Sequence, residues 1–413
     1  MGVYLLKGHF HWAEVLSAQR DPHYPPIRSA HPLPSHILKL MNRSSHHEEE
    51  KKLKILALDG GGIRGVVTAT ILQEVEALVG QPLHQYFDFI AGTSTGSILA
   101  AGLALGMEPK ELRKVYQERG REIFKSGWSR KTLSWLWGSK YKHEGLIKVV
   151  REEFRKKAGE DITFGQVDKF TSTELLIFAY DTLYCNTTCF TSRPPKPRWY
   201  HDMKLWEICA ASASAPTFFP PYEFKWTDPN DPKKQEWSYP HVDGGVSSNC
   251  PGLAALGHVL ALKKTPLKDI SILSIGTGRT THPIQYEQMK KWGKLWWGSQ
   301  IVDVFMEGQI QLATDTCAEI INSVNSPGYL RLQFDLNQVF RQRKTLLSPP
   351  PLLEEKERVN SFIHEKISEA MDDASQENIE RLIDAATKFT DTNTTTIQEF
   401  LLAQQKHSGD RPG

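Results

Sequence analysis

The 413-residue chain has little cysteine, little net charge and no long hydrophobic run. An odd, sparse set of cysteines does not form a disulfide framework, and a single pair four residues apart lacks the second pair of ligands that a zinc site needs. We therefore expect five reduced thiols and neither metal nor other cofactor. The formal net charge of +2 gives no reason to expect a nucleic-acid polymer as partner. The cysteines are Cys185, Cys189, Cys209, Cys250 and Cys317.

The absence of a long apolar run argues against a segment that spans a membrane. No run approaches the roughly 20 residues that span a bilayer, and the apolar start, Val3 to Leu6, is followed at once by Lys7. This pattern does not fit a secretory signal, and Leu6 stands where myristoylation favours Ser or Thr. We expect a cytoplasmic protein.

Short apolar runs alternate with helical patterns along the middle of the chain. This alternation predicts an α/β domain with a largely parallel sheet. Residues 1–52 are rich in Pro, His and charge and are interpreted as an extension or linker, residues 53–345 as the main domain, and residues 346–413 as a polar C-terminal helical extension. The expected strands include 53–59, 86–92, 173–181, 237–243 and 270–278, of which 53–59, 86–92 and 270–278 are expected to be buried.

A glycine-rich turn, "DGGGIRG" (residues 59–65), follows the first expected strand and opens a helix. Gly60, Gly62 and Gly65 fit the dinucleotide-binding spacing, but Asp59 would then face the pyrophosphate, and the expected acidic strand end about 20 residues on is missing. The second interpretation is an oxyanion hole, in which glycine N–H groups approach a developing negative charge unobstructed. Arg64 would then add positive charge or brace the loop, and Asp59 would accept backbone hydrogen bonds.

A serine lies in a second sharp turn, "GTSTG", between an expected strand and an expected helix. Ser94 has Gly92 and Gly96 two residues away on either side, which is typical of a nucleophile elbow. The alternative is that Ser94 only caps the following helix. A serine nucleophile needs a base, and none of the fifteen histidines stands in an informative context.

A carboxylate is the alternative candidate for the base. Asp243 ends an expected strand and precedes Gly244 and Gly245, which would let it lie against another backbone turn. The alternative is an ordinary Asp-Gly-Gly turn. That alternative is strong for the tripeptide alone and weak beside the two earlier motifs.

Taken in order, "DGGGIRG", "GTSTG" and "DGG" resemble the patatin-like phospholipase family, and "ASASAPTFFPPY" and "SILSIGTG" also resemble family segments. The resemblance implies a three-layer α/β/α sandwich and a calcium-independent lipid acyl hydrolase acting on phospholipids, lysophospholipids or galactolipids. It further implies a Ser94–Asp243 catalytic dyad without histidine. Gly60, Gly61 and Gly62 would form the oxyanion hole, with Arg64 supporting it.

Two tryptophan-rich basic stretches, residues 128–143 and 289–300, favour contact with a membrane surface. We expect Trp135, Trp137, Trp296 and Trp297 to form an interfacial rim near the cleft and so to attach the protein peripherally to membranes. The alternative is that these helices pack on the core. Residues 110–157 also carry 15 Lys and Arg against 6 Glu.

Two rival functions remain at this point. One is a patatin-like effector switched on by a small cyclic nucleotide, with control residing in residues 1–52, in the basic stretch or in the C-terminal extension. The other is a non-catalytic lipid-binding scaffold, against which the joint presence of the three motifs argues. The sequence does not indicate an oligomeric state.

Overall fold

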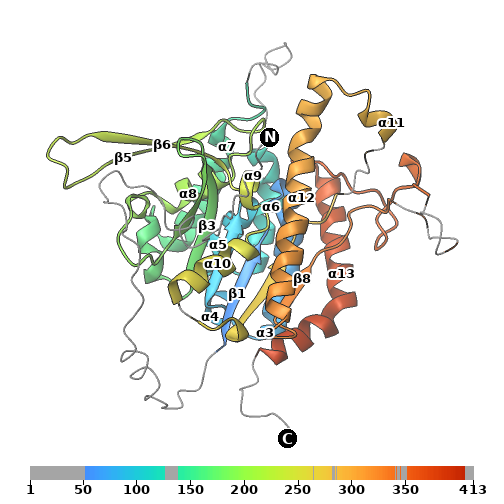
Figure 1. Ribbon diagram of the computed structural model, residues 1–413, viewed down its shortest axis with the longest axis horizontal. Coiled ribbons are helices and arrows are strands. Elements are labelled where there is room, and N and C mark those ends of the chain that lie inside the picture. The colour runs from blue at the N-terminus through green and yellow to red at the C-terminus, as the bar shows by residue number, and fades with distance from the viewer. Residues whose placement is uncertain are drawn as a thin grey trace, which may run out of the picture.

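The computed structural model describes residues 52–125, 138–263, 265–280, 284, 286–339, 341, 345 and 351–404. Its centre is an eight-stranded mixed sheet in the order β5-β6-β3-β2-β1-β7-β8, with β4 also paired to β3 (Figure 1). Five strands run parallel: β1 (Leu53–Leu58), β2 (Phe89–Thr93), β3 (Glu174–Asp181), β7 (Ile270–Ile275) and β8 (Tyr329–Leu332). Three are antiparallel to their neighbours: β4 (Asn186–Thr191), β5 (Tyr222–Thr227) and β6 (Glu236–Asp243).

The parallel strands are buried on both faces because helices cover both sides of the sheet. Successive residues of β1 show this: Leu56 and Leu58 enter one hydrophobic core, and Ile55 and Ala57 enter the other. The larger core is formed with α3 (Gly65–Val79), α5 (Thr95–Ala104), α6 (Pro109–Ile123), α7 (His143–Ala158), α8 (Leu205–Ser212) and α13 (Gln376–Ala403). The smaller core is formed with α10 (Gly252–Lys263) and α12 (Lys294–Asn322). The predicted three-layer α/β/α fold is confirmed.

Short helical turns connect these elements. Four α-helical or 3-10 turns lie close to the motifs or the sheet: η1 (Gly62–Arg64), α4 (Leu83–Tyr86), α9 (Gly245–Ser248) and η4 (Phe164–Lys169). The others are η5 (Trp199–His201), η6 (Leu267–Asp269), α11 (Tyr286–Met289) and η7 (Glu355–Glu357). The β5–β6 hairpin extends away from the layers (Figure 1).

Strand β3 pairs with three other strands, and this pairing decides where the turns that carry Ser94 and Asp243 meet. Its residues 174–178 pair with β2, residues 179–181 pair with β6, and β4 pairs along 176–181. Because β4 overlaps both other partners, β2 and β6 must share the opposite edge of β3. Thr93 pairs with Phe178, and Asp243 pairs with the next residue, Ala179. The end of β2 therefore lies beside the end of β6.

The C-terminal part differs from expectation. Helix was predicted over the polar residues after 350, but 351–375 holds only η7 and irregular chain, and the long helix begins at Gln376. Asn337 and Asn360 satisfy backbone groups of this segment with their side chains, which compete with helical hydrogen bonds. Helix α13 shares the larger core with α3, whereas the predicted boundary at 345/346 stays a prediction.

None of the described helices combines the length and the hydrophobicity needed to cross a bilayer. All five cysteines are free thiols, with Cys185 exposed, Cys189 half-buried and the other three buried.

Candidate active site

Ser94 lies in the turn between β2 and α5, with a backbone φ of 55° and ψ of −124°. This conformation is unusual for a residue with a side chain and costs on the order of 1–3 kcal/mol. The turn is tight: a Cβ on Gly92 would come within 2.3 Å of the Gly96 carbonyl oxygen. The sequence folds this way because small residues flank Ser94, and the result is a strand–turn–helix elbow that presents one hydroxyl at the start of α5.

Hydrogen bonds from neighbouring serines hold the strained turn. The Ser94 N–H donates to Ser212 Oγ at 2.9 Å, and Ser212 Oγ donates to the Phe178 carbonyl at 2.6 Å. Ser97 donates to the Ser94 carbonyl through its N–H at 2.9 Å and through Oγ at 2.6 Å. Ser212, from "ASASAP", thus ties the elbow to β3.

Asp243 ends β6 and faces Ser94. Its Oδ1 accepts the Gly245 N–H at 2.7 Å, its own N–H donates to the Ser214 carbonyl at 3.0 Å, and only 5% of the residue is exposed. Burial raises the pKa of Asp243 from its ordinary value of 3.8 to about 6, although the Ser94 hydroxyl and the Gly245 N–H lower it. The carboxylate is therefore a stronger base than a solvated aspartate and is still ionised at neutral pH.

The glycine loop lies against the same serine. A Cβ on Gly60 would stand 3.1 Å from Ser94 Cβ. The Gly60 N–H already donates to the Asn249 carbonyl at 3.1 Å, so it is not available as an oxyanion donor. In the described part of the chain, the N–H groups of Gly61 and Gly62 have no acceptor. Of the three N–H groups predicted to form the oxyanion hole, only those of Gly61 and Gly62 therefore remain candidates.

Asp59 anchors the loop from behind, but not as expected. Its buried carboxylate pairs through both oxygens with the Arg331 guanidinium of β8, with 2.9 Å between Arg331 Nη1 and Asp59 Oδ1. The prediction that the Asp59 carboxylate accepts backbone hydrogen bonds is wrong, because both of its oxygens pair with the Arg331 guanidinium. Burial alone would lower the pKa of Arg331, but the charge and hydrogen bonds of Asp59 raise it, so Arg331 stays charged although buried.

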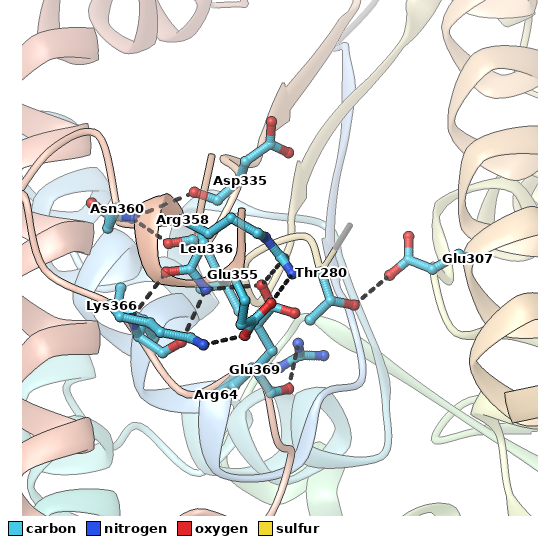
Figure 2. A network of polar contacts seen from close by, with 12 residues as sticks. Arg64, Thr280, Glu307, Asp335, Leu336, Glu355, Arg358, Asn360, Lys366 and Glu369 are labelled. Atoms are coloured by element: carbon cyan, nitrogen blue, oxygen red, sulfur yellow. Dashed lines mark hydrogen bonds and ion pairs between the residues drawn. The ribbon is translucent and has the colours of Figure 1, made fainter. Parts of the chain in front are cut away.

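Arg64 braces the loop and does not enter the cavity. Its Nη1 donates to the Glu369 carbonyl at 3.4 Å (Figure 2), and Arg64 is absent from the residues that line the cavity beside Ser94. Of the two roles expected for Arg64, the structure favours bracing.

An apolar cavity opens at Ser94. It is lined in part by Ser94, Asp243, Gly61 and Gly62. The walls carry mainly aliphatic and aromatic side chains, including Ile98, Met107, Leu112, Val115, Ile123, Phe124, Leu146, Val149, Val150, Phe154, Phe218 and Phe219. Such a cavity favours a hydrocarbon chain over a polar ligand. No group of His, Cys, Asp or Glu arranged for a metal ion occurs among the residues described.

Asn249 is a site residue that the sequence argument missed. It lines the cavity, is 3% exposed, and its Oδ1 has no hydrogen-bond partner among the described residues. Its Oδ1 occupies the space that a Cβ on Gly60 would enter, at 2.3 Å. Its place six residues after Asp243 in "DGGVSSNC" is the only local signal that could have drawn attention to it.

The structure describes only part of the predicted tryptophan rim. Trp135 and Trp137 lie outside the described residues, and Trp296 lies in α12 in a stretch whose side chains are not described. Trp297 is half-buried, and its ring packs edge-on against Trp292 with 5.2 Å between centroids. Trp297 is not among the residues that line the cavity in the described part of the chain.

Known proteins similar to this chain include patatin-like proteins and phospholipases. A family model described as patatin-like phospholipase matches residues 56–256. The chain is 30% identical over 332 residues to patatin-like protein 2 of Oryza sativa subsp. indica, covering 71% of this chain and 79% of that one. It is 34% identical over 228 residues to a cGAMP-activated phospholipase of Pseudomonas aeruginosa, covering 54% and 62%. Human GIVD cytosolic phospholipase A2 aligns with a TM-score of 0.44 and 10% identity, covering 89% and 62%.

The chain belongs to the patatin-like phospholipase family. The resemblance found in the three sequence motifs is confirmed, and membership supports a lipid hydrolase.

Proposed function

We propose that this protein is a lipid acyl hydrolase that cleaves carboxylic esters through an acyl-serine intermediate. The observation that carries the proposal is that one apolar cavity is lined by a strained serine, a buried carboxylate and two glycines whose N–H groups lack an acceptor among the described residues. These are the parts that acyl transfer requires: nucleophile, base and oxyanion donors.

In the first step, the Ser94 oxygen attacks the ester carbonyl while Asp243 accepts the hydroxyl proton. The N–H groups of Gly61 and Gly62 stabilise the resulting oxyanion; one such donor is worth roughly 2.7–4 kcal/mol in other hydrolases. The protonated Asp243 then gives its proton to the departing alcohol, which leaves an acyl-serine. In the second step, Asp243 takes a proton from water and the water oxygen attacks the acyl carbonyl. Asp243 then returns the proton to the departing Ser94 oxygen, and the fatty acid and free Ser94 are released.

The length of the cavity favours a long acyl chain. Helix α5 starts beside Ser94 and has 10 residues, so it is about 15 Å long. A Cβ on Gly102, in its last turn, would touch Met107 and Leu112, and both line the cavity. Lining residues thus lie both beside Ser94 and beside the last turn of α5, a separation that suits a fatty acyl chain.

The direct test is release of free fatty acid from mixed vesicles of phospholipid and galactolipid. We expect release without added metal ion, and the ratio of products from the two lipids to identify the preferred headgroup. Absence of release from any vesicle, and from soluble long-chain esters, would contradict the proposal and favour a lipid-binding scaffold.

The pH dependence follows from Asp243. Only the ionised carboxylate can accept the Ser94 proton, and its pKa is about 6. We expect kcat/KM for a neutral ester to rise with pH and to level off above about pH 7, with about a tenth of the plateau remaining at pH 5. An activity that stays constant from pH 5 to 8 would mean that Asp243 is not the base.

A second candidate is a hydrolase switched on by a cyclic nucleotide, favoured by the similarity to the cGAMP-activated phospholipase. The vesicle assay separates the two: a switched enzyme releases fatty acid only after a cyclic di- or oligonucleotide is added, and a constitutive enzyme releases it without one.

Peripheral membrane contact by Trp135, Trp137, Trp296 and Trp297 also remains a proposal. Cosedimentation with anionic vesicles tests it, and a folded variant with all four residues changed to Ala should bind more weakly than the parent. Equal binding by the two proteins would contradict it.

A further inference from the structure

The glycine loop is covered by a segment that precedes α13 by only a few residues. The Met371 carbonyl accepts the Ile63 N–H at 2.8 Å, and a Cβ on Gly62 would come within 2.2 Å of the same oxygen. Met371 also lines the cavity together with Ser94 and Gly61. The backbone that carries the proposed oxyanion donors is thus held on one side by Met371.

A polar network fixes the start of this segment (Figure 2). The Glu369 carboxylate accepts Arg358 Nη2 at 2.9 Å and Asn337 Nδ2 at 2.8 Å, and both charged side chains are about nine-tenths buried. The Glu369 carbonyl accepts the Arg64 guanidinium. Because a buried carboxylate with charged and amide partners is held tightly, Glu369 fixes where the next residues cross the loop.

The other end of this segment, at Asp372, is bonded to residues that pack on the wall of the cavity. Asp372 pairs with Lys140 and accepts the Tyr141 hydroxyl at 2.7 Å. The Tyr141 ring packs against the cavity-lining Phe124 and Phe219, with centroids 5.6 and 5.7 Å apart. Asp372 therefore connects the loop contact at Met371 to the aromatic wall.

We propose that residues 369–374, which we call the C-terminal clamp, are part of the active site, with Asp372 as a positioning residue for the oxyanion loop. This inference rests on the proposed function and extends it, since the clamp lies outside the matched family region, residues 56–256. The clamp keeps the Gly61 and Gly62 N–H groups aimed at the reacting carbonyl, and Asp372 acts through Met371 and not on the substrate.

Two measurements on the full chain test the clamp. The variants are Asp372→Ala, Tyr141→Phe, which removes a single hydroxyl, and Asp372→Glu as the conservative rescue. Asp384→Asn is the matched control, because this aspartate also forms a lysine pair near the clamp but lies exposed on α13. The first measurement is hydrogen exchange at the Ile63 amide, which we expect to become about tenfold faster in Asp372→Ala and unchanged in the control.

The second measurement is hydrolysis of p-nitrophenyl butyrate. A loosened oxyanion loop loses interactions made in the transition state, so we expect kcat to fall about tenfold with KM within about twofold of the parent. Tyr141→Phe should show a smaller loss, and Asp372→Glu should recover part of kcat. Parental exchange at Ile63, or a parental kcat despite faster exchange, would overturn the proposal.

The two proposals fail in different ways. A parent protein that hydrolyses no ester contradicts the proposed function, while hydrogen exchange at Ile63 still decides whether the clamp holds the loop. An active parent whose Asp372 and Tyr141 variants match it in both measurements contradicts the clamp alone.

Discussion

Replacing Ser94 with alanine should lower fatty-acid release by at least about 10³-fold, to the level of the uncatalysed reaction in the same vesicles. Without the hydroxyl no acyl-enzyme forms, and the remaining donors and cavity can only bind the ester. The fold should survive, since the turn is held by the Ser94 N–H and carbonyl, which alanine retains. Initial rates of release, with thermal melting as the check on folding, measure both effects.

A matched control is Ser323→Ala, which removes another serine hydroxyl that bonds only to a nearby carbonyl in α12. We expect parental activity from it. If Ser94→Ala retained most of the parental rate while Ser323→Ala behaved normally, another residue would have to be the nucleophile.

Asp243→Asn should abolish activity and yet stabilise the protein at neutral pH. The amide cannot accept the Ser94 proton, so we expect a loss of at least about 10³-fold in kcat/KM. The stability effect follows from burial: the carboxyl pKa is about 6 in the folded protein against an ordinary 3.8, and the difference corresponds to about 3 kcal/mol of free energy of unfolding.

The sign and pH range of this effect are specific. Because the folded pKa lies above the unfolded one, ionisation weakens the folded state as pH rises from about 4 to 6, and the penalty is complete above that range. Asparagine avoids it, so urea unfolding should show a gain of up to about 3 kcal/mol at pH 7 and little difference at pH 4. Asp228→Asn, at a half-buried aspartate that follows β5, should change neither property. A less stable Asp243→Asn protein at pH 7 would contradict this origin of the shifted pKa.

The parts of the site that the sequence revealed are those whose signal is local. Ser94 follows the buried strand β2, Asp243 is the last residue of β6, and both lie near glycines, so strand–turn patterns were enough to single them out. Their closeness could only be inferred from family resemblance, because it depends on two strands sharing one edge of β3, a register that no short stretch encodes.

The residues that hold the glycine loop in place were not predicted from the sequence, because they are distant in sequence from the residues that they contact. Arg331 meets Asp59 from 272 positions away, and Met371 reaches the glycine loop from a segment that was expected to be helical. Nothing near either residue distinguishes it from an ordinary strand arginine or a surface methionine. Residues 351–375, which include the clamp, hold only η7 and irregular chain where helix was expected, and side chains such as Asn360 satisfy part of the backbone there.

The central claim is that Ser94 is a nucleophile activated by Asp243, and covalent labelling tests it most directly. A long-chain alkyl fluorophosphonate is incubated with the parent, Ser94→Ala and Asp243→Asn proteins, and adducts are located by peptide mass spectrometry. We expect one adduct, on Ser94 of the parent, forming at a rate that rises with pH around a pKa of about 6. Neither variant should be labelled at a comparable rate. An adduct on a different residue, or equal labelling of the Asp243→Asn protein, would contradict the dyad.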